Sequence, residues 1–246
     1  MKMEIRINKY LSDAGFCSRR AADKLIEEGR VTINGRVPEV GEKIPEGTVV
    51  CVDGKEVHAE SEEILIAFNK PVGIVCTATD KQGDNNIVDY INYGKRIYPM
   101  GRLDKMSEGL ILLTNNGEIM NRMLNASYNH EKEYLVEVDK NITADFVKKL
   151  GSGVYLKDLD KTTAPCRVEP VYRNKDITKP TRRFKITLVQ GMNRQVRRMC
   201  EEFGFRVKKL KRIRIMNILL GTLPTGHYRS LSVKERNQFL RDLKLR

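Results

Sequence analysis

The chain has 246 residues, which suits one large domain or a small domain joined to a medium one, with a buried core in either case. It carries 45 Lys and Arg against 32 Asp and Glu, a formal net charge of +13, so we expect an anionic partner, either nucleic acid or a membrane surface. Its apolar runs are far shorter than the roughly 20 residues of a membrane-spanning helix, and its first ten residues show no apolar signal core. We therefore expect a soluble, cytoplasmic protein.

The cysteines and histidines argue against a metal or a disulfide framework. The five cysteines are widely scattered with no Cys-x-x-Cys pair, and the chain has only three histidines. Neither of the glycine-rich phosphate-binding patterns, G-x-x-x-x-G-K-[ST] or G-x-G-x-x-G, occurs in the sequence. We therefore expect any chemistry to proceed without a metal and without a cofactor.

The first 57 residues have the pattern of a compact α+β unit. Apolar residues recur at helical spacing over residues 7–14, and Ser18 is placed to cap a second helix that ends at Gly29. An alternating pair of β-branched residues then leads into Asn34-Gly35, which predicts a hairpin turn, and a further short strand is expected over 49–52. Two helices feeding a small sheet are the predicted outline.

A polar linker at residues 58–63 is expected to separate this unit from a second domain over residues 64–246. There, short alternating strands mix with helices, which predicts an α+β domain dominated by a sheet. The strands are expected from Ile64, after Asp104, around Tyr134 and before Gly191. The helices are expected at residues 118–124, 144–150 behind Thr143, 193–203, and after a capping box of Ser232 and Glu235.

Most of the excess positive charge lies in one segment. Residues 182–214 hold twelve Lys or Arg and two Glu, a net charge of +10. In the predicted helix 193–203, apolar residues fall at i, i+3, i+4 and i+7 and face the core, which leaves Arg194, Arg197 and Arg198 on another stripe. That stripe is a candidate phosphate contact, although a solvated helix face with ion pairs is the ordinary alternative.

Four stretches of the sequence resemble known proteins. They are GRLDKMSEGLILLTNNGE from Gly101, HEKEYLVEVDK from His130, LVQGMNRQVRRMCEEFGFRVKKLKRIRI from Leu188, and the front segment INKYLSDAGFCSRRAADKLIEEGRVTINGR from Ile7. The first three resemble a family of bacterial RNA pseudouridine synthases. This family includes the small-subunit ribosomal RNA enzyme and the large-subunit ribosomal RNA enzymes of types B, E and F, and the resemblance is greatest to the F type. The front segment resembles the alpha-L RNA-binding domain named after small-subunit ribosomal protein S-four.

This resemblance implies an isomerase that converts a uridine of structured RNA into pseudouridine. The implied substrate is 23S ribosomal RNA, and a tRNA anticodon loop stays open as a second one. The implied fold is a small RNA-binding domain followed by a mixed, largely antiparallel sheet, and the implied mechanism uses base flipping and an aspartate without cofactor or metal. By resemblance Asp104 is the catalytic aspartate, and attack on the sugar, attack on the base and abstraction of a ribose proton all stay open.

The resemblance also gives roles to residues around Asp104. Arg197 is the implied partner of Asp104, and a guanidinium at close range lowers an aspartate pKa by about 1 to 3 units. Tyr134 is implied to pack on the target uracil, although its alternation in the strand fits a core tyrosine equally. Val196 is a candidate for packing on the same base, and plain core burial is its alternative role. Arg102 is a candidate for filling the space of the extruded nucleotide, and a phosphate contact is its alternative role.

In the front domain we expect RNA contacts from Lys9, Arg19, Arg20 and Asn34. Residues 1–57 hold ten basic and ten acidic residues, so position rather than net charge has to provide these contacts.

Two other interpretations stay open from the residues alone: a non-catalytic RNA-binding or ribosome-assembly protein, and a DNA-binding protein. We expect a monomer, because no long exposed apolar helix face is apparent.

Overall fold

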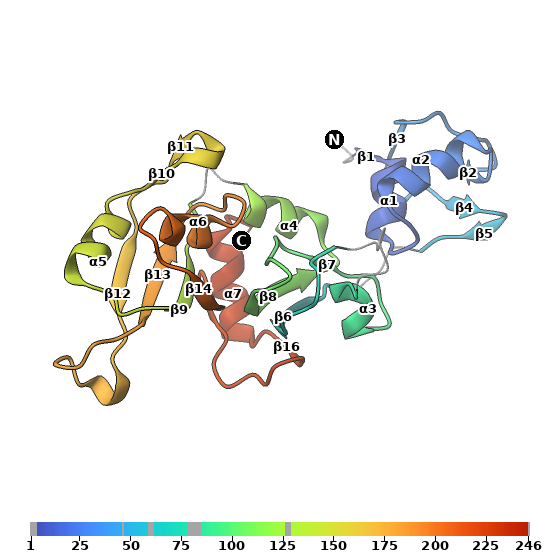
Figure 1. The fold of residues 1–246 in the computed structure, drawn as a ribbon. Helices are drawn as coiled ribbons and strands as arrows, with labels where there is room; N and C mark the ends of the chain where they lie inside the picture. Colours follow the sequence, from blue (N-terminus) through green and yellow to red (C-terminus); the bar gives the residue numbers. More distant parts are fainter. Residues whose placement is uncertain (1–3, 46, 59–61, 78–84, 126–128, 246) are drawn as a thin grey trace. The chain divides into compact units, whose positions relative to one another are not determined.

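The computed structural model describes residues 4–45, 47–58, 62–77, 85–125 and 129–245, which form two compact units (Figure 1). The front unit comprises Met1–Ile64 together with Gly94–Arg96 and Asn115–Gly117, and the sheet unit comprises the rest. The expected linker at 58–63 lies partly outside the described residues, since 59–61 are not described. Within the described part of the chain, every helix is too short or too polar to cross a membrane.

The front unit packs two helices on small sheets. Buried Ile7, Leu11, Ala22 and Ile26 meet the buried strand residues in one apolar cluster. Its elements are β1 (Glu4–Arg6), α1 (Ile7–Asp13), α2 (Arg19–Glu27), β2 (Val31–Ile33), β3 (Lys43–Pro45), β4 (Val50–Val52) and β5 (Lys55–Glu56). Strands β2, β4 and β5 form one sheet, and β1 pairs with β3.

Local signals in the front unit predicted one feature correctly and another only in part. The Ser18 side chain accepts a hydrogen bond from the Ala21 N–H, which confirms the helix cap. Asn34 and Gly35 both have positive φ, as a tight turn requires, but the turn is followed by a single bridge between Ile33 and Arg36. Strand β2 pairs instead with β4, because the chain after the turn leaves the sheet and returns later.

The sheet unit is built on a nine-stranded sheet with the order β12-β13-β9-β14-β8-β6-β16, to which β7 and β15 add at β8 and β14. Its strands are β6 (Leu65–Lys70), β7 (Tyr98–Pro99), β8 (Glu108–Thr114), β9 (Lys132–Val138), β12 (Arg167–Pro170), β13 (Arg183–Leu188), β14 (Val207–Ile215), β15 (Ile218–Leu219) and β16 (Tyr228–Ser230). A separate pair is formed by β10 (Tyr155–Leu156) and β11 (Lys161–Thr162). Among the described strands, all pairs are antiparallel except β14 with β8, which confirms the expected mixed, largely antiparallel sheet.

Helices cover both faces of this sheet (Figure 1). They are α3 (Ile87–Ile91), α4 (Gly117–Leu124), α5 (Ala144–Gly151), α6 (Gln195–Glu201) and α7 (Val233–Asp242). Helices α5 and α6 bury Phe146, Leu150 and Met199 against β9, β13 and β14, whereas α4 and α7 pack on β6 and β8 in a second cluster. The capping box of Ser232 and Glu235 is present at the start of α7, as predicted.

One row of paired residues crosses the middle of the sheet and forms the floor of the candidate site. Tyr134 of β9 pairs with Arg212 of β14, Arg212 pairs with Gly109 of β8, and Gly109 pairs with Lys70 of β6. Because directly paired residues point to the same face, the side chains of Tyr134, Arg212 and Lys70 share one side of the sheet. Gly109 has φ +105°, and a Cβ built on it would lie 2.7 Å from the Arg212 backbone nitrogen.

Replacing Gly109 with alanine is expected to lower the free energy of unfolding by about 3 kcal/mol or more, since it adds a backbone collision to an unfavourable φ. Gly221 is the matched control, because it also has positive φ (+56°) but no atom within 4 Å of the position that an added methyl group would take. Gly221→Ala is expected to cost only about 1 to 2 kcal/mol. Urea unfolding followed by circular dichroism measures both, and equal losses would contradict the close approach of β8 and β14.

Candidate active site

The site is built around the Asp104 loop, which we define as residues 101–107, between β7 and β8. Gly101 opens the loop with φ +92°, and the Ser107 N–H closes a turn by donating to the Asp104 carbonyl at 3.0 Å. The buried Leu103 donates its N–H to Cys76 Sγ at 3.4 Å. Asp104 itself is partly exposed.

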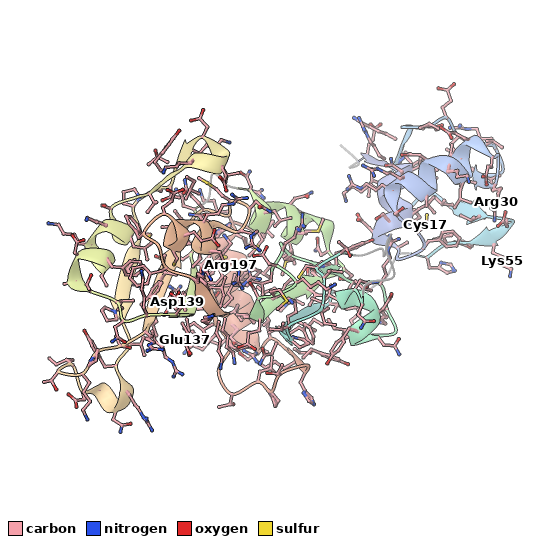
Figure 2. The ribbon with its side chains drawn as sticks, viewed as in Figure 1. Cys17, Arg30, Lys55, Glu137, Asp139 and Arg197 are labelled. Carbon is pink, nitrogen blue, oxygen red and sulfur yellow. The ribbon has the colours of Figure 1, made fainter. Side chains whose placement is uncertain are left out.

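Arg197 reaches this loop from α6, as expected, but it contacts the backbone and Ser107 of the loop instead of the Asp104 carboxylate. Its Nη2 donates to the Met106 carbonyl at 2.8 Å and to Ser107 Oγ at 3.4 Å, and its Nη1 donates to the Val207 carbonyl at 3.2 Å. Among the described residues, neither a hydrogen bond nor an ion pair joins Arg197 to the Asp104 carboxylate. The arginine thus holds the main chain of the loop, and Figure 2 shows its side chain in the middle of the sheet unit.

The charge of Asp104 nevertheless acts on Arg197. Burial lowers the pKa of Arg197 below its ordinary value, Arg194 lowers this pKa further, and the negative charge of Asp104 opposes both. Arg197 is 8% exposed rather than lying on a solvated stripe, and its Nε is buried without a hydrogen-bond partner. The ordinary alternative of an exposed, ion-paired arginine is therefore wrong for Arg197.

The two residues expected to pack on a base differ in their surroundings. Tyr134 is only partly buried and lies at the edge of the apolar cluster under α5 and α6, so one part of its side chain is open. Val196 is 4% exposed and belongs to the same cluster. In this structure Val196 fills the core, which is the second of its two predicted roles.

The other basic residues expected near the site differ in their exposure and in their contacts. Arg102 and Arg194 are exposed, and Arg194 has φ +51° just before α6, which begins two residues later than predicted. Arg198 is partly buried, hydrogen-bonds to Asn193 and forms an ion pair with Asp158. Arg102 and Arg194 are therefore better placed than Arg198 to meet a phosphate.

Two buried cations near Asp104 were missed by the sequence analysis. Lys70 is fully buried and its Nζ donates to the carbonyls of Pro71 and Ile74, both at 2.8 Å. Burial lowers the pKa of Lys70, and Cys76 and Asp104 oppose this effect. Arg212 is 3% exposed and donates to the Leu110 and Arg102 carbonyls. The available signals were weak: Lys70 closely follows the apolar run that begins at Ile64, and Arg212 lies two residues after Leu210 in a run of basic residues.

Lys132 adds a further cation two residues before Tyr134. Burial, together with the charge of Arg212, lowers the pKa of Lys132 to about 8, and its Nζ donates to the His130 carbonyl at 2.9 Å. The His130 ring is largely buried and contacts the Arg122 carbonyl, which fits an orienting role in its loop. The face of the sheet near Tyr134 is thus strongly cationic, with Asp104 as a nearby acid.

The front unit holds the other predicted contact residues. Lys9 pairs with Asp13 at 2.5 Å within α1, so its charge is partly neutralised. Arg19 and Arg20 are exposed at the start of α2 and have no ion pair among the described residues, and Asn34 is exposed in its turn. In the described ranges, no cluster of three His, Cys, Asp or Glu side chains could hold a metal ion.

Comparisons with known proteins agree with this architecture. A family model described as RNA pseudouridylate synthase matches residues 64–202, and an S4 domain model matches residues 5–50. The Dual-specificity RNA pseudouridine synthase RluF of Escherichia coli O6:H1 is 50% identical over 94% of this chain and 77% of its own. Ribosomal large subunit pseudouridine synthase B of Bacillus subtilis is 37% identical over 94% of this chain and 93% of its own.

A solved structure described as a pseudouridylate synthase is similar over 96% of this chain and 99% of its own, with a TM-score of 0.68 and 26% identity. The match of sequence and fold runs through both units. A purely RNA-binding protein and a DNA-binding protein, the two alternatives left by the residues alone, are therefore excluded. The chain belongs to the RNA pseudouridylate synthase family, as an RsuA-type member with an S4 domain, and is an RNA pseudouridine synthase.

Proposed function

We propose that this enzyme isomerises a specific uridine of 23S ribosomal RNA and that Asp104 is its catalytic aspartate. Two kinds of relative support the substrate: one is named a ribosomal large subunit pseudouridine synthase, and the other a dual-specificity RNA pseudouridine synthase. A tRNA anticodon loop is proposed as a second substrate. The setting is the cytoplasm, and the enzyme acts as a monomer.

The reaction rearranges bonds without oxidation or reduction. The bond between uracil N1 and ribose C1′ breaks, the uracil rotates, a bond forms between C5 and C1′, a proton leaves C5 and N1 receives one. No electron or group has to enter from outside, so ionisable side chains and positioned donors are sufficient in principle. We propose that no cofactor or metal takes part.

The observation that carries the proposal is the way the Asp104 loop is held. Arg197 fixes the Met106 and Ser107 end of the loop through hydrogen bonds, while the Asp104 carboxylate has no hydrogen-bond partner among the described residues. A carboxylate next to cations but not locked to any of them can act on a substrate as nucleophile or base. This supports Asp104 as the reacting group and Arg197 as its electrostatic support.

Two further residues are proposed to handle the flipped nucleotide. Tyr134, partly open at the edge of its cluster, is proposed to pack on the target uracil. Arg102 is exposed on the Asp104 loop and is proposed to take the space that the extruded base leaves, since a guanidinium plane can stack on neighbouring bases. Opening the stack costs a few kcal/mol, and such stacking offsets part of it.

The front domain is proposed to span residues 1–57, with a linker at 58–63 and a catalytic domain at 64–246. We propose that it contributes RNA contacts through Arg19, Arg20 and Asn34, with Lys9 in support. Arg19 and Arg20 are the strongest candidates, because both are exposed and unpaired among the described residues at the start of α2. The N-terminal end of a helix also attracts phosphate through its free N–H groups.

Asp104→Asn is expected to lower tritium release from RNA labelled at uridine C5 by about 10³-fold or more, because the amide cannot act as nucleophile or base. RNA binding is expected to stay within about threefold, since the asparagine keeps the shape of the loop. Asp176→Asn serves as the matched control, as Asp176 contacts Thr178 on a surface loop. Full release by the Asp104 variant would reject the assignment.

Pseudouridine mapping after incubation with the purified enzyme tests the substrate. We expect one modified position in unmodified 23S ribosomal RNA and one in the anticodon loop of a tRNA, both absent with Asp104→Asn. The small-subunit ribosomal RNA is the matched control and should gain none. Modification of that control alone would overturn the proposed substrate while leaving the catalytic assignment in place.

The double variant Arg19→Ala with Arg20→Ala is expected to bind RNA more weakly and to reduce the slope of log affinity against log salt by about 1 to 2, the value for two lost phosphate contacts. Arg30→Ala is the control: Arg30, labelled in Figure 2, already forms an ion pair with Asp53 at 2.6 Å. Its removal should leave the slope unchanged. An unchanged slope in the double variant would contradict the proposed contact.

A further inference from the structure

Arg212 is a charged side chain in a place where the fold by itself calls for an apolar one. It lies in β14 between Tyr134 of β9 and Gly109 of β8, on the face of the sheet where Leu210 belongs to the apolar cluster. It is 3% exposed, and no acidic side chain among the described residues pairs with it. Burying a guanidinium without an acid is costly, and a well-packed apolar residue avoids that cost.

Among the described residues, the side-chain hydrogen bonds of Arg212 go to two main-chain carbonyls, one within the Asp104 loop and one after it. Its Nε donates to the Leu110 carbonyl at 2.6 Å, just after the loop, and its Nη1 donates to the Arg102 carbonyl at 3.4 Å, within the loop. Asp104 is two residues beyond Arg102. The planar, forked guanidinium has a fixed geometry and can hold these two carbonyls at a fixed spacing, whereas a lysine amine is a flexible point donor.

Stability alone does not account for this residue, because its hydrogen bonding is incomplete. The Arg212 Nη2 is buried and has no partner, and the same is true of the Arg197 Nε. Unsatisfied buried donors are rare in folded proteins, and each one calls for an explanation such as strain or a role in catalysis. Here both belong to arginines that grip the Asp104 loop, one at each end.

We propose that Arg212 is a positioning residue that sets the place of Asp104 through the main chain of Arg102, as the counterpart of Arg197 at Met106 and Ser107. The proposal rests on the proposed role of Asp104. A carboxylate displaced by about 1 Å from the reacting atoms loses on the order of 10²-fold in rate, so an anchor at each end of the loop matters for the chemical step. Neither anchor has to touch the RNA to act in this way.

The test compares Arg212→Met and Arg212→Lys with Arg214→Met in single-turnover reactions at saturating enzyme. Arg214 lies on the same strand, but its guanidinium pairs with Glu131 and Glu133 and does not contact the loop. We expect a drop in the rate constant of about 10²-fold for Arg212→Met and at least about tenfold for Arg212→Lys. Arg214→Met should stay within about threefold of the wild-type rate, and RNA affinity should stay within about threefold for all three variants.

The rate constant separates positioning from a merely structural role, because at saturating enzyme a partly unfolded preparation lowers the concentration of active enzyme and not the rate constant of its folded fraction. A wild-type rate for folded Arg212→Met, or a loss that appears only in RNA affinity, would overturn the proposal. If the methionine variant does not fold, Arg212→Lys provides the comparison. If neither variant folds, a crystal structure of the wild-type enzyme with RNA decides: the Arg212 guanidinium must remain on the Arg102 carbonyl, and its Nη2 must gain an oxygen acceptor.

Failure of this proposal is distinguishable from failure of the proposed function. If Asp104→Asn keeps full activity, the assignment of Asp104 fails whatever Arg212 does. If Asp104→Asn is inactive and Arg212→Met reacts at the wild-type rate, only the positioning role fails. The pair of variants therefore tests the two statements separately.

Discussion

The site depends on buried cations whose hydrogen bonds go to backbone carbonyls rather than to carboxylates. Arg197, Arg212 and Lys70 all follow this rule, and together they bind six carbonyls in the loops and strands next to Asp104. Such contacts fix the main chain and leave the positive charge unneutralised. A fully paired arrangement would stabilise the resting protein better, but it would also occupy Asp104, the acid that we propose reacts with the substrate.

The topology of the sheet makes this arrangement possible. Strand β14 lies between β9, which is antiparallel to it, and β8, which is parallel to it, so one strand brings Arg212 next to both Tyr134 and Gly109. Gly109 lets the two backbones approach more closely than any side chain would allow. The Asp104 loop leads into β8, and therefore its position is set by the register of two central strands rather than by the loop sequence alone.

Much of the fold could be predicted because its signals are local. The Ser18 and Thr143 caps, the capping box at Ser232 and the alternation around Tyr134 each depend on a few neighbouring residues, and each holds in the structure. Strand β14 was missed, since its alternating pattern is hidden in a run of lysines and arginines. The beginning of α6 was placed too early, because Arg194 takes a left-handed conformation that no local pattern predicts.

The candidate site was predictable to a smaller extent, for a physical reason. Asp104 and Tyr134 were singled out through motif resemblance, and Arg197 was linked to Asp104 in the same way. Whether a guanidinium binds a carboxylate or a carbonyl is decided by ångström-scale tertiary geometry, so the contacts of Arg197 with the loop backbone could not be foreseen. Lys70 and Arg212 were missed, because burial of a charged residue is a property of the folded sheet.

The contacts of the basic residues, and not only their number, decide how much of the positive charge is available to RNA. Within residues 182–214, Arg183, Lys185, Arg198 and Arg214 are ion-paired to acids elsewhere in the sheet unit, and two further arginines are buried. Half of the twelve cations in this segment are therefore not free to neutralise phosphate. In the front unit, with no net charge, Arg19 and Arg20 remain exposed and unpaired within the described ranges. We therefore expect affinity for RNA to depend on which cations the fold leaves unpaired, so that net charge overstates this affinity in the sheet unit and understates it in the front unit.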